Sequence, residues 1–104
     1  MNKYGAIKTE IDGIIFDSRK ESRRYSELKL LEYKGDITEL ELQPKYPCVV
    51  NGKKVCVYVA DFRYVENGQT VVEDAKSEAT RKNSAYRIKK KLTEAIYNIA
   101  IVEV

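Results

Sequence analysis

Histidine is absent from the 104 residues of this chain. Its absence excludes catalytic triads built on imidazole, histidine-ligated zinc sites and the commonest general base of enzymes. Any catalysis must therefore use carboxylates, lysine, tyrosine, serine or a hard metal ion held by oxygen ligands. The two cysteines, Cys48 and Cys56, are too few for a disulfide framework or, without histidine, for a zinc site. We expect both to be buried strand residues.

Long apolar runs are also lacking, since none approaches the roughly 20 residues of a membrane-spanning helix. The first residues, MNKYGAIKTEIDG, lack the apolar core of a signal peptide. We therefore expect a cytoplasmic protein without membrane contact. A chain of 104 residues, 43% of them hydrophobic and 34% charged, is typical of one globular domain over residues 1–104.

Basic residues are in slight excess, with a net charge of +3, and their distribution is uneven. The segment RKNSAYRIKKK, residues 81–91, has six basic and no acidic residues among its 11. A second basic cluster, Arg19, Lys20, Arg23 and Arg24, surrounds Glu21. Such clusters either contact phosphates or are solvated helix faces, and charge alone leaves both readings open.

Turn and periodicity signals predict a β-hairpin, a helix, three strands, a second helix and a final strand. This order predicts an α/β fold, with a mixed central sheet flanked by a helix on each face. A Ser-x-x-Glu capping box, Ser18 with Glu21, begins the first helix. The stripe expected to be buried on the second helix is Ala85, Ile88, Leu92, Ala95 and Ile96. The predicted elements are a hairpin turning at Asp12-Gly13 (residues 6–18), a helix (18–35), a strand (37–47), two runs around Asn51-Gly52 with a long apolar strand over 55–65, a strand after Asn67-Gly68 (69–76), a helix (83–98) and a strand (99–104).

The stretch DFRYVENGQTVVEDAK, residues 61–76, reads as two strands joined by the dipeptide Asn67-Gly68. A two-residue type I′ turn there would place Asp61 directly opposite Asp74. Because side chains alternate between faces of a strand, Lys76 would share their face and Glu73 would point to the other.

Two carboxylates opposed in this way are destabilising unless a cation lies between them. A divalent metal ion would remove the conflict, and Asp61 and Asp74 offer the hard oxygen ligands that Mg²⁺ prefers. Lys76 would then act beside the metal on an attacking water or on a phosphate. Two alternatives remain open. In the first, a longer loop or a bulge shifts the register and separates the two aspartates. In the second, Asp74 and Lys76 neutralise each other locally.

An Asp on one strand, followed by [Asp/Glu]-x-Lys on the paired strand, resembles the PD-(D/E)XK nuclease superfamily. The matching residues are Asp61 and the run Asp74-Ala75-Lys76. Many members carry a further Glu on a preceding helix, and Glu21 in FDSRKESRRYSEL matches it. The helix and strand order resembles the superfamily core, although Ala60 stands where the superfamily name has proline.

The whole chain resembles short phage-type proteins of that superfamily, and this resemblance implies a restriction-endonuclease-like core. It further implies a metal-dependent DNA endonuclease, in one form a resolvase of branched, Holliday-junction-like DNA. By resemblance, Asp61 and Asp74 would hold Mg²⁺ or Mn²⁺ with help from Glu21, and Lys76 would be the catalytic lysine. For Glu21 the capping box is the competing role.

Basic residues near the second helix are predicted to contact DNA phosphates. They are Arg81, Lys82, Arg87, Lys89, Lys90 and Lys91. A homodimer is expected by analogy with resolvases of the superfamily. Gln43 either hydrogen-bonds near the site or is only a turn residue before Pro44. Two other functions compete with a nuclease: a non-catalytic DNA-binding or regulatory protein on the same fold, and a protein-interaction module.

Overall fold

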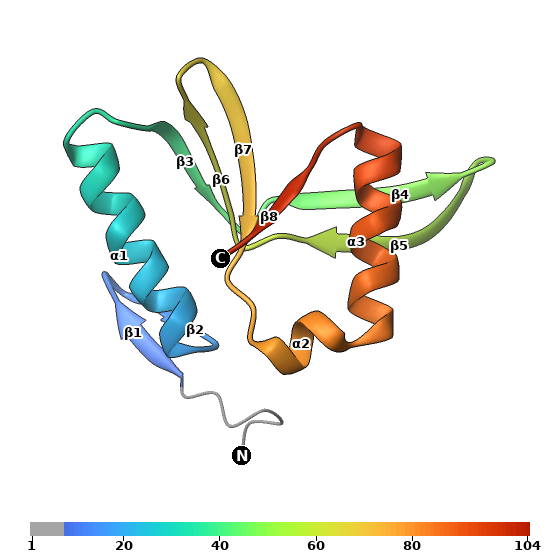
Figure 1. Cartoon of the computed structure of the whole chain (residues 1–104), viewed down its shortest axis with the longest axis horizontal. Helices are drawn as coiled ribbons and strands as arrows, with labels where there is room; N and C mark the ends of the chain where they lie inside the picture. The colour runs from blue at the N-terminus through green and yellow to red at the C-terminus, as the bar shows by residue number, and fades with distance from the viewer. Residues whose placement is uncertain (1–7) are drawn as a thin grey trace.

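The computed structural model describes residues 8–104 (Figure 1). A four-stranded mixed sheet has the strand order β3-β6-β7-β8, in which β7 and β8 are parallel and the other neighbours antiparallel. Two further two-stranded sheets are formed by β1 with β2 and by β4 with β5. The elements are β1 (Thr9–Ile11), β2 (Ile14–Phe16), α1 (Arg19–Tyr33), β3 (Thr38–Leu42), β4 (Lys45–Val50), β5 (Lys53–Val59), β6 (Phe62–Glu66), β7 (Gln69–Asp74), α2 (Glu78–Lys82), α3 (Ser84–Tyr97) and β8 (Ile101–Glu103).

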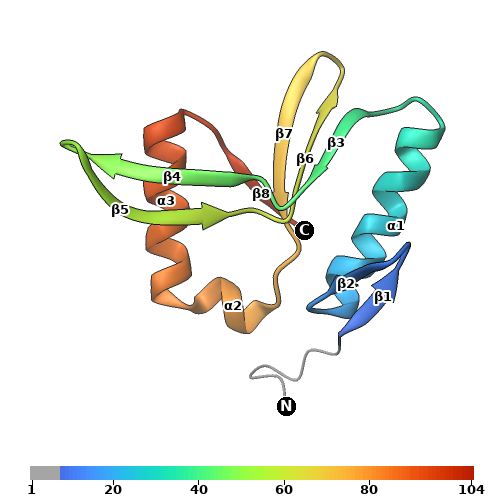
Figure 2. The same cartoon turned by 180° about the vertical axis from the view of Figure 1, so that it is seen from behind.

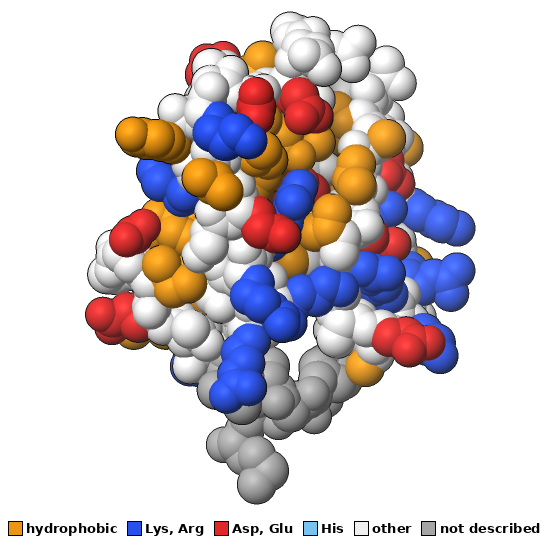
Figure 3. All heavy atoms as spheres, turned by 60° about the vertical axis from the view of Figure 1, so that its left-hand side comes forward, with side chains coloured by type: hydrophobic (Ala, Val, Ile, Leu, Met, Phe, Trp, Pro, Cys, Tyr) orange, Lys and Arg blue, Asp and Glu red, His pale blue; other side chains and the backbone are white. Residues whose placement is uncertain are grey.

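The α/β class, the mixed sheet and the N-terminal hairpin are therefore confirmed for the described residues. Of the predicted hairpin, residues 6 and 7 lie outside the described part of the chain. Helix α1 lies on one side of the four-stranded sheet, and α3 lies on the other side with the β4–β5 hairpin (Figure 1 and Figure 2). On the face where α1 comes forward, Lys and Arg side chains gather across the lower half (Figure 3).

Helix α1 is capped by hydrogen bonds at both of its ends. The Ser18 hydroxyl accepts a hydrogen bond from the Glu21 amide at 3.1 Å, which satisfies one of the free N–H groups of the first turn. At the other end Gly35 has φ +84°, and its amide donates to the Glu32 carbonyl at 3.0 Å. The Asp36 amide donates to the Leu31 carbonyl at 2.9 Å, which completes a Schellman motif.

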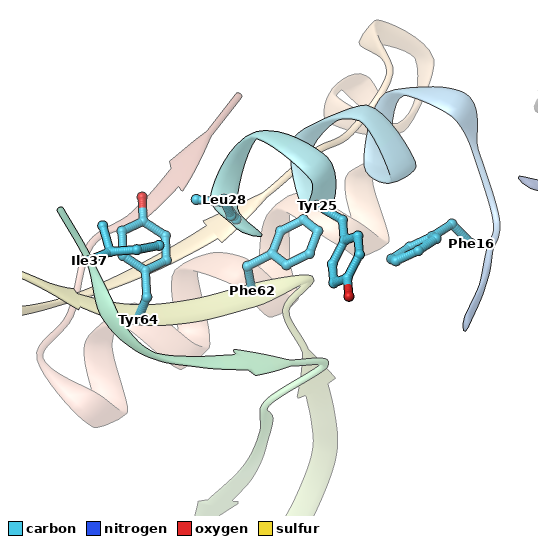
Figure 4. Close-up of a cluster of buried hydrophobic side chains, with 6 residues drawn as sticks. All are labelled: Phe16, Tyr25, Leu28, Ile37, Phe62 and Tyr64. Carbon is cyan, nitrogen blue, oxygen red and sulfur yellow. The ribbon is translucent and has the colours of Figure 1, made fainter. Parts of the chain in front are cut away.

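Two apolar clusters lie on opposite faces of the four-stranded sheet. The first packs α1 and the end of β2 onto β6, and the second packs the β4–β5 hairpin and α3 against β7 and β8. Each cluster anchors one helix, so the sheet is the rigid centre of the domain. The first cluster contains Phe16, Tyr25, Leu28, Ile37, Phe62 and Tyr64 (Figure 4), and the second contains Tyr46, Tyr58, Ala60, Val72 and Ile101.

The predicted strand 37–47 and the predicted long strand 55–65 are each broken in two, which corrects the sequence reading. Both breaks fall at one corner, because the Gln43 amide donates to the Asp61 carbonyl at 2.9 Å and the Ala60 amide donates to the Pro44 carbonyl at 3.1 Å. Gln43 has φ +51°, a left-handed conformation that turns the chain out of the first sheet. A single antiparallel ribbon is thus bent, so that one part pairs as β3–β6 and the other as β4–β5.

Helix α3 has the predicted extent, with Asn83 and Asn98 as its caps, but the predicted buried stripe is wrong. Ile88 is 66% exposed and Ile96 is 39% exposed, whereas Thr93 is fully buried. Tyr97 shows why: its hydroxyl donates to the Pro47 carbonyl at 2.6 Å. The helix thus lies on the β4–β5 hairpin with its tyrosine and threonine side, and most of its apolar stripe faces outward.

The short helix α2 was not predicted from the sequence. Ser77 caps it, since its hydroxyl accepts from the Thr80 amide at 3.2 Å. Together α2 and α3 form the crossover that a parallel pair such as β7 and β8 requires. None of the helices in residues 8–104 has the length and apolar character needed to cross a membrane.

Replacing Ile88 by Gln should therefore change the free energy of unfolding of the monomer by less than about 0.5 kcal/mol, because the side chain is already mostly in water. Leu28→Ala, at a fully buried position of α1, should cost about 2–5 kcal/mol. Urea unfolding followed by circular dichroism measures both. A loss of more than about 2 kcal/mol for Ile88→Gln would show that the stripe is covered in solution.

Candidate active site

The hairpin of β6 and β7 has the predicted register. Asn67 and Gly68 have φ of 52° and 77°, as a type I′ turn requires, and Glu66 pairs with Gln69. The ladder runs to Phe62 opposite Glu73, and one step further lie Asp61 and Asp74. The predicted cross-strand position of the two aspartates is therefore confirmed, and no bulge interrupts the β6–β7 ladder.

Asp61 and Asp74 hold each other in place through the backbone. One Asp74 oxygen, Oδ1, accepts a hydrogen bond from the Asp61 amide at 2.9 Å. In return Asp61 Oδ2 accepts from the Ala75 amide at 2.8 Å. The second Asp74 oxygen, Oδ2, accepts from the Tyr58 hydroxyl. Both residues are buried, so these bonds fix the carboxylates with little freedom to rotate.

Lys76 lies beside the pair, as the register predicted. Its Nζ donates to Asp61 Oδ1 at 3.1 Å. Burial alone would lower the pKa of Lys76, but the charges of Asp61 and Asp74 outweigh it and raise that pKa overall. Lys76 therefore remains an ammonium ion at neutral pH.

The two aspartates are nevertheless under electrostatic strain. Burial raises the pKa of Asp61, and the charge of Asp74 adds to this effect while Lys76 opposes it. Burial also raises the pKa of Asp74, with the hydrogen bond from Tyr58 opposing. Burial is the largest cause of both shifts, so the charged forms of the two aspartates are disfavoured relative to those of exposed carboxylates.

Glu21 on α1 belongs electrostatically to the same group. Burial, followed by the charge of Asp61, raises the pKa of Glu21 to about 7. Its backbone amide donates to the Ser18 hydroxyl, but among residues 8–104 the Glu21 carboxylate accepts no hydrogen bond from the Ser18 amide. Only half of the capping box is formed. Glu21 contributes its amide to the cap, while the pKa of its carboxyl is raised by burial and by the charges of the aspartate pair.

Glu73, as predicted, points to the opposite face of the hairpin, and there it anchors α1. Arg24 donates to it twice, from Nε to Oε1 at 2.6 Å and from Nη2 to Oε2 at 3.0 Å. The Tyr64 hydroxyl donates to Glu73 Oε2 at 2.6 Å. Because Glu21 precedes Arg24 by three residues, this bidentate ion pair also sets the position of Glu21.

Sequence reasoning missed three residues of the site. Glu103 on β8 is the register partner of Asp74, and the Tyr86 hydroxyl donates to its Oε2 at 2.8 Å. Tyr86 is therefore the second missed residue, and Tyr58 is the third. Tyr58 was missed because it lies on β5, beyond the corner that the sequence did not reveal. A signal existed for Glu103 alone, in the acidic residue of the closing strand IVEV, but its register with Asp74 follows only from the parallel pairing of β7 and β8.

The other predicted residues are placed at varying distances from this group. Gln43 touches the corner through its backbone, while its side chain is exposed. Of the predicted DNA contacts, Lys82 pairs with Glu78 at 3.1 Å and Lys90 with Glu94 at 3.3 Å. Arg87, Lys89 and Lys91 are exposed on α3, and Arg81 is half-buried.

Asp61 and Asp74 are the residues best suited to hold a metal ion. Each carboxylate oxygen accepts one hydrogen bond from the chain and retains a second lone pair, and Mg²⁺ is commonly bound by one or two carboxylates together with water and substrate phosphates. In residues 8–104 no group of three or more acidic or cysteine side chains is gathered closely enough to form a complete ligand set. The donor chemistry therefore fits a hydrated Mg²⁺ on two aspartates, with Glu21 as an additional negative charge.

Fold and site together define a small mixed α/β domain with a buried aspartate pair and a lysine at the end of its central hairpin. The chain belongs to the family described as protein of unknown function (DUF1064), whose sequence profile matches residues 1–102. Comparisons with curated proteins and with solved structures found no match.

The raised pKa of Glu21 predicts a stability that falls with pH. Folded Glu21 binds its proton more tightly than unfolded Glu21, so stability present below pH 4.5 is lost as the pH rises towards 7. In EDTA, Glu21→Gln should raise the free energy of unfolding by about 1–3 kcal/mol at pH 8 and change it little at pH 4. Urea unfolding at the two pH values measures this. The exposed Glu10→Gln is the control, and an equal gain for both variants would contradict the account.

Arg24→Ala should cost about 3–5 kcal/mol, because it leaves the Glu73 carboxylate buried without its partner. Adding Glu73→Gln to this variant should recover part of the loss, since the second change removes the uncompensated charge. Thermal and urea unfolding test both variants against Arg23→Ala, a change at the exposed neighbouring arginine. A cost below about 1 kcal/mol for Arg24→Ala would show that the ion pair does not hold α1 in place.

Proposed function

We propose that this protein is a metal-dependent endonuclease that hydrolyses phosphodiester bonds of DNA, with branched DNA as one substrate. The observation that carries the proposal is the buried pair Asp61 and Asp74, opposed across the end of β6 and β7, with Lys76 alongside. It is supported by the sequence resemblance to the PD-(D/E)XK superfamily. A restriction-endonuclease-like core is part of the same proposal.

In this proposal Asp61 and Asp74 hold Mg²⁺ or Mn²⁺, and Glu21 adds negative charge beside them. The bound metal would supply Lewis-acid polarisation of the scissile phosphate and a lowered pKa for an attacking water. In the hydrolysis a water oxygen would form the bond to phosphorus as the bond to the leaving sugar oxygen breaks, with the proton of the water passing to solvent and the leaving oxygen taking a proton from solvent. The ammonium group of Lys76 offsets the negative charge that develops on the phosphate.

The hydrogen bonds on the aspartates explain how the chain keeps them ready for this task. Backbone amides and the Tyr58 hydroxyl hold the two carboxylates before any ligand binds, so little order has to be gained on binding. The Lys76 ammonium is held against Asp61 in the same way. A homodimer is also proposed, because one domain of 104 residues covers little duplex and two sites would cut two strands.

The rival function is a non-catalytic DNA-binding protein on the same fold. The specific observation in its favour is that all four oxygens of the aspartate pair already accept hydrogen bonds from the chain itself. In that case the aspartate pair would only stabilise the fold. The rival predicts DNA binding that falls with salt, is unaffected by Asp61→Asn, and is accompanied by no hydrolysis with any divalent ion.

Cleavage of supercoiled plasmid and of a four-way junction, each with Mg²⁺, separates these functions. Wild type should nick both, and Asp74→Asn and Lys76→Ala should each lower the rate by about 100-fold or more, as loss of an electrostatic contact to the transition state does. Matched controls are Asp36→Asn and Lys53→Ala, both at exposed positions away from the corner.

Equal cleavage by wild type and by the two site variants would refute the site assignment. Cleavage that persists in EDTA would refute the metal mechanism. Faster cleavage of the junction than of a linear duplex of the same sequence would assign the branched substrate. Circular dichroism spectra of all variants confirm that a lost rate is not lost folding.

A further inference from the structure

Three basic side chains from α1 and α2 converge beside the aspartate pair. The Lys20 Nζ donates a hydrogen bond to the Lys76 carbonyl at 3.0 Å. Arg81 Nη2 donates to the Val104 carbonyl at 2.8 Å, and the Val104 amide in turn donates to the Asp74 carbonyl at 2.9 Å. Lys20 and Arg81 are thus anchored to the backbone of the two chain segments that border the site, while Arg23 is the third member, one turn further along α1.

None of the ion pairs in residues 8–104 involves Lys20, Arg23 or Arg81. Burial lowers the pKa of Lys20, and the charges of Arg81 and Arg23 lower it further. Of the acids, Glu103 has the opposite effect and raises the pKa of Lys20, and its carboxylate also accepts a hydrogen bond from the Tyr86 hydroxyl.

Arg81 also has a donor that nothing in this part of the chain satisfies. Its Nε is buried and has no hydrogen-bond partner in residues 8–104. An unsatisfied buried donor is destabilising, and more so when it is charged. Nη2 of the same guanidinium is bonded to the main-chain oxygen of Val104, so the group is held in place with one donor unsatisfied.

We propose that Lys20, Arg23 and Arg81 bind one backbone phosphate of DNA, next to the phosphate that lies at the aspartate pair. The inference rests on the proposed nuclease function and adds to it a specific contact. Guanidinium and ammonium groups together suit a phosphate because they offer several charge-assisted donors to its oxygens. The hydrogen bond from Lys20 to the carbonyl of Lys76 places this cluster directly beside the proposed catalytic lysine.

The basic residues of α3 are not anchored in this way, because within residues 8–104 Arg87, Lys89 and Lys91 donate no side-chain hydrogen bond to the backbone, although they too are absent from the ion pairs. Lys90 is paired with Glu94, and Lys82 on α2 is paired with Glu78. Arg87 and Lys91 border the exposed stripe of α3 that contains Ile88, an apolar surface. The face on which α1 comes forward, by contrast, carries a broad band of Lys and Arg side chains (Figure 3).

Fluorescence anisotropy with a labelled duplex in EDTA tests the proposal without requiring cleavage. The double variant Lys20→Gln/Arg81→Gln should bind about 10-fold more weakly than wild type, and the slope of log K against log salt should fall by about 1, the value for one lost phosphate contact. The matched control is Lys53→Gln/Lys54→Gln, which removes the same charge at the turn of the β4–β5 hairpin, far from the C-terminus (Figure 2). It should bind within about twofold of wild type and keep its slope.

Equal weakening by the two double variants would overturn the proposal, because only net charge would matter. If the Lys20/Arg81 variant does not fold, the exposed Arg23→Gln carries the test against Lys53→Gln, with about threefold weaker binding expected for Arg23→Gln alone. A duplex that binds no better than deoxythymidine monophosphate, at equal phosphate concentration, would also overturn it, since the cluster would then bind free phosphate compounds. Binding through the cluster without any cleavage would refute the nuclease and leave this contact standing.

Discussion

The cross-strand hydrogen bonds that the Asp61 and Asp74 carboxylates accept, from the Ala75 amide and the Asp61 amide respectively, are the constraint on which the rest of the domain depends. Each carboxylate accepts from a backbone amide on the other strand, and this happens where the ribbon bends from one sheet into the next. The bend turns β4 and β5 away from the main sheet, so that α3 can cover them, and it brings Tyr58 back onto Asp74. Two buried acidic side chains therefore lie at the bend, and their hydrogen bonds hold its strands together.

The buried position of these carboxylates also raises their pKa values. Burial that raises the pKa of Asp61, Asp74 and Glu21 also raises the gain from binding a cation. Helix α1, which contributes Glu21, is held by its apolar cluster and by the ion pair of Arg24 with the buried Glu73 on the far face of β7. The β6–β7 hairpin therefore has two roles. Its face towards α1 carries Glu73, which anchors that helix, and its opposite face carries the two aspartates.

Local signals explain which parts could be predicted from the sequence. The register of β6 and β7 followed from Asn67-Gly68, because a type I′ turn leaves one pairing. The extent of α1 followed from its capping signals and that of α3 from its apolar periodicity. The buried side of α3 did not follow, because hydrophobic periodicity cannot tell that tyrosines would face the β4–β5 hairpin. The bend at Ala60 was hidden within a continuous apolar run, and Glu103 was missed because parallel pairing is a long-range contact.

The central claim is that Asp61 and Asp74 form a metal site and do not only stabilise the fold. Titration calorimetry with Mn²⁺ on wild type and on Asp61→Asn, at the same pH and salt, tests it most directly. The account predicts saturable Mn²⁺ binding to wild type that Asp61→Asn weakens at least about 10-fold, because one of two charged ligands is lost. Identical titrations for the two proteins, or no binding to wild type, would contradict it.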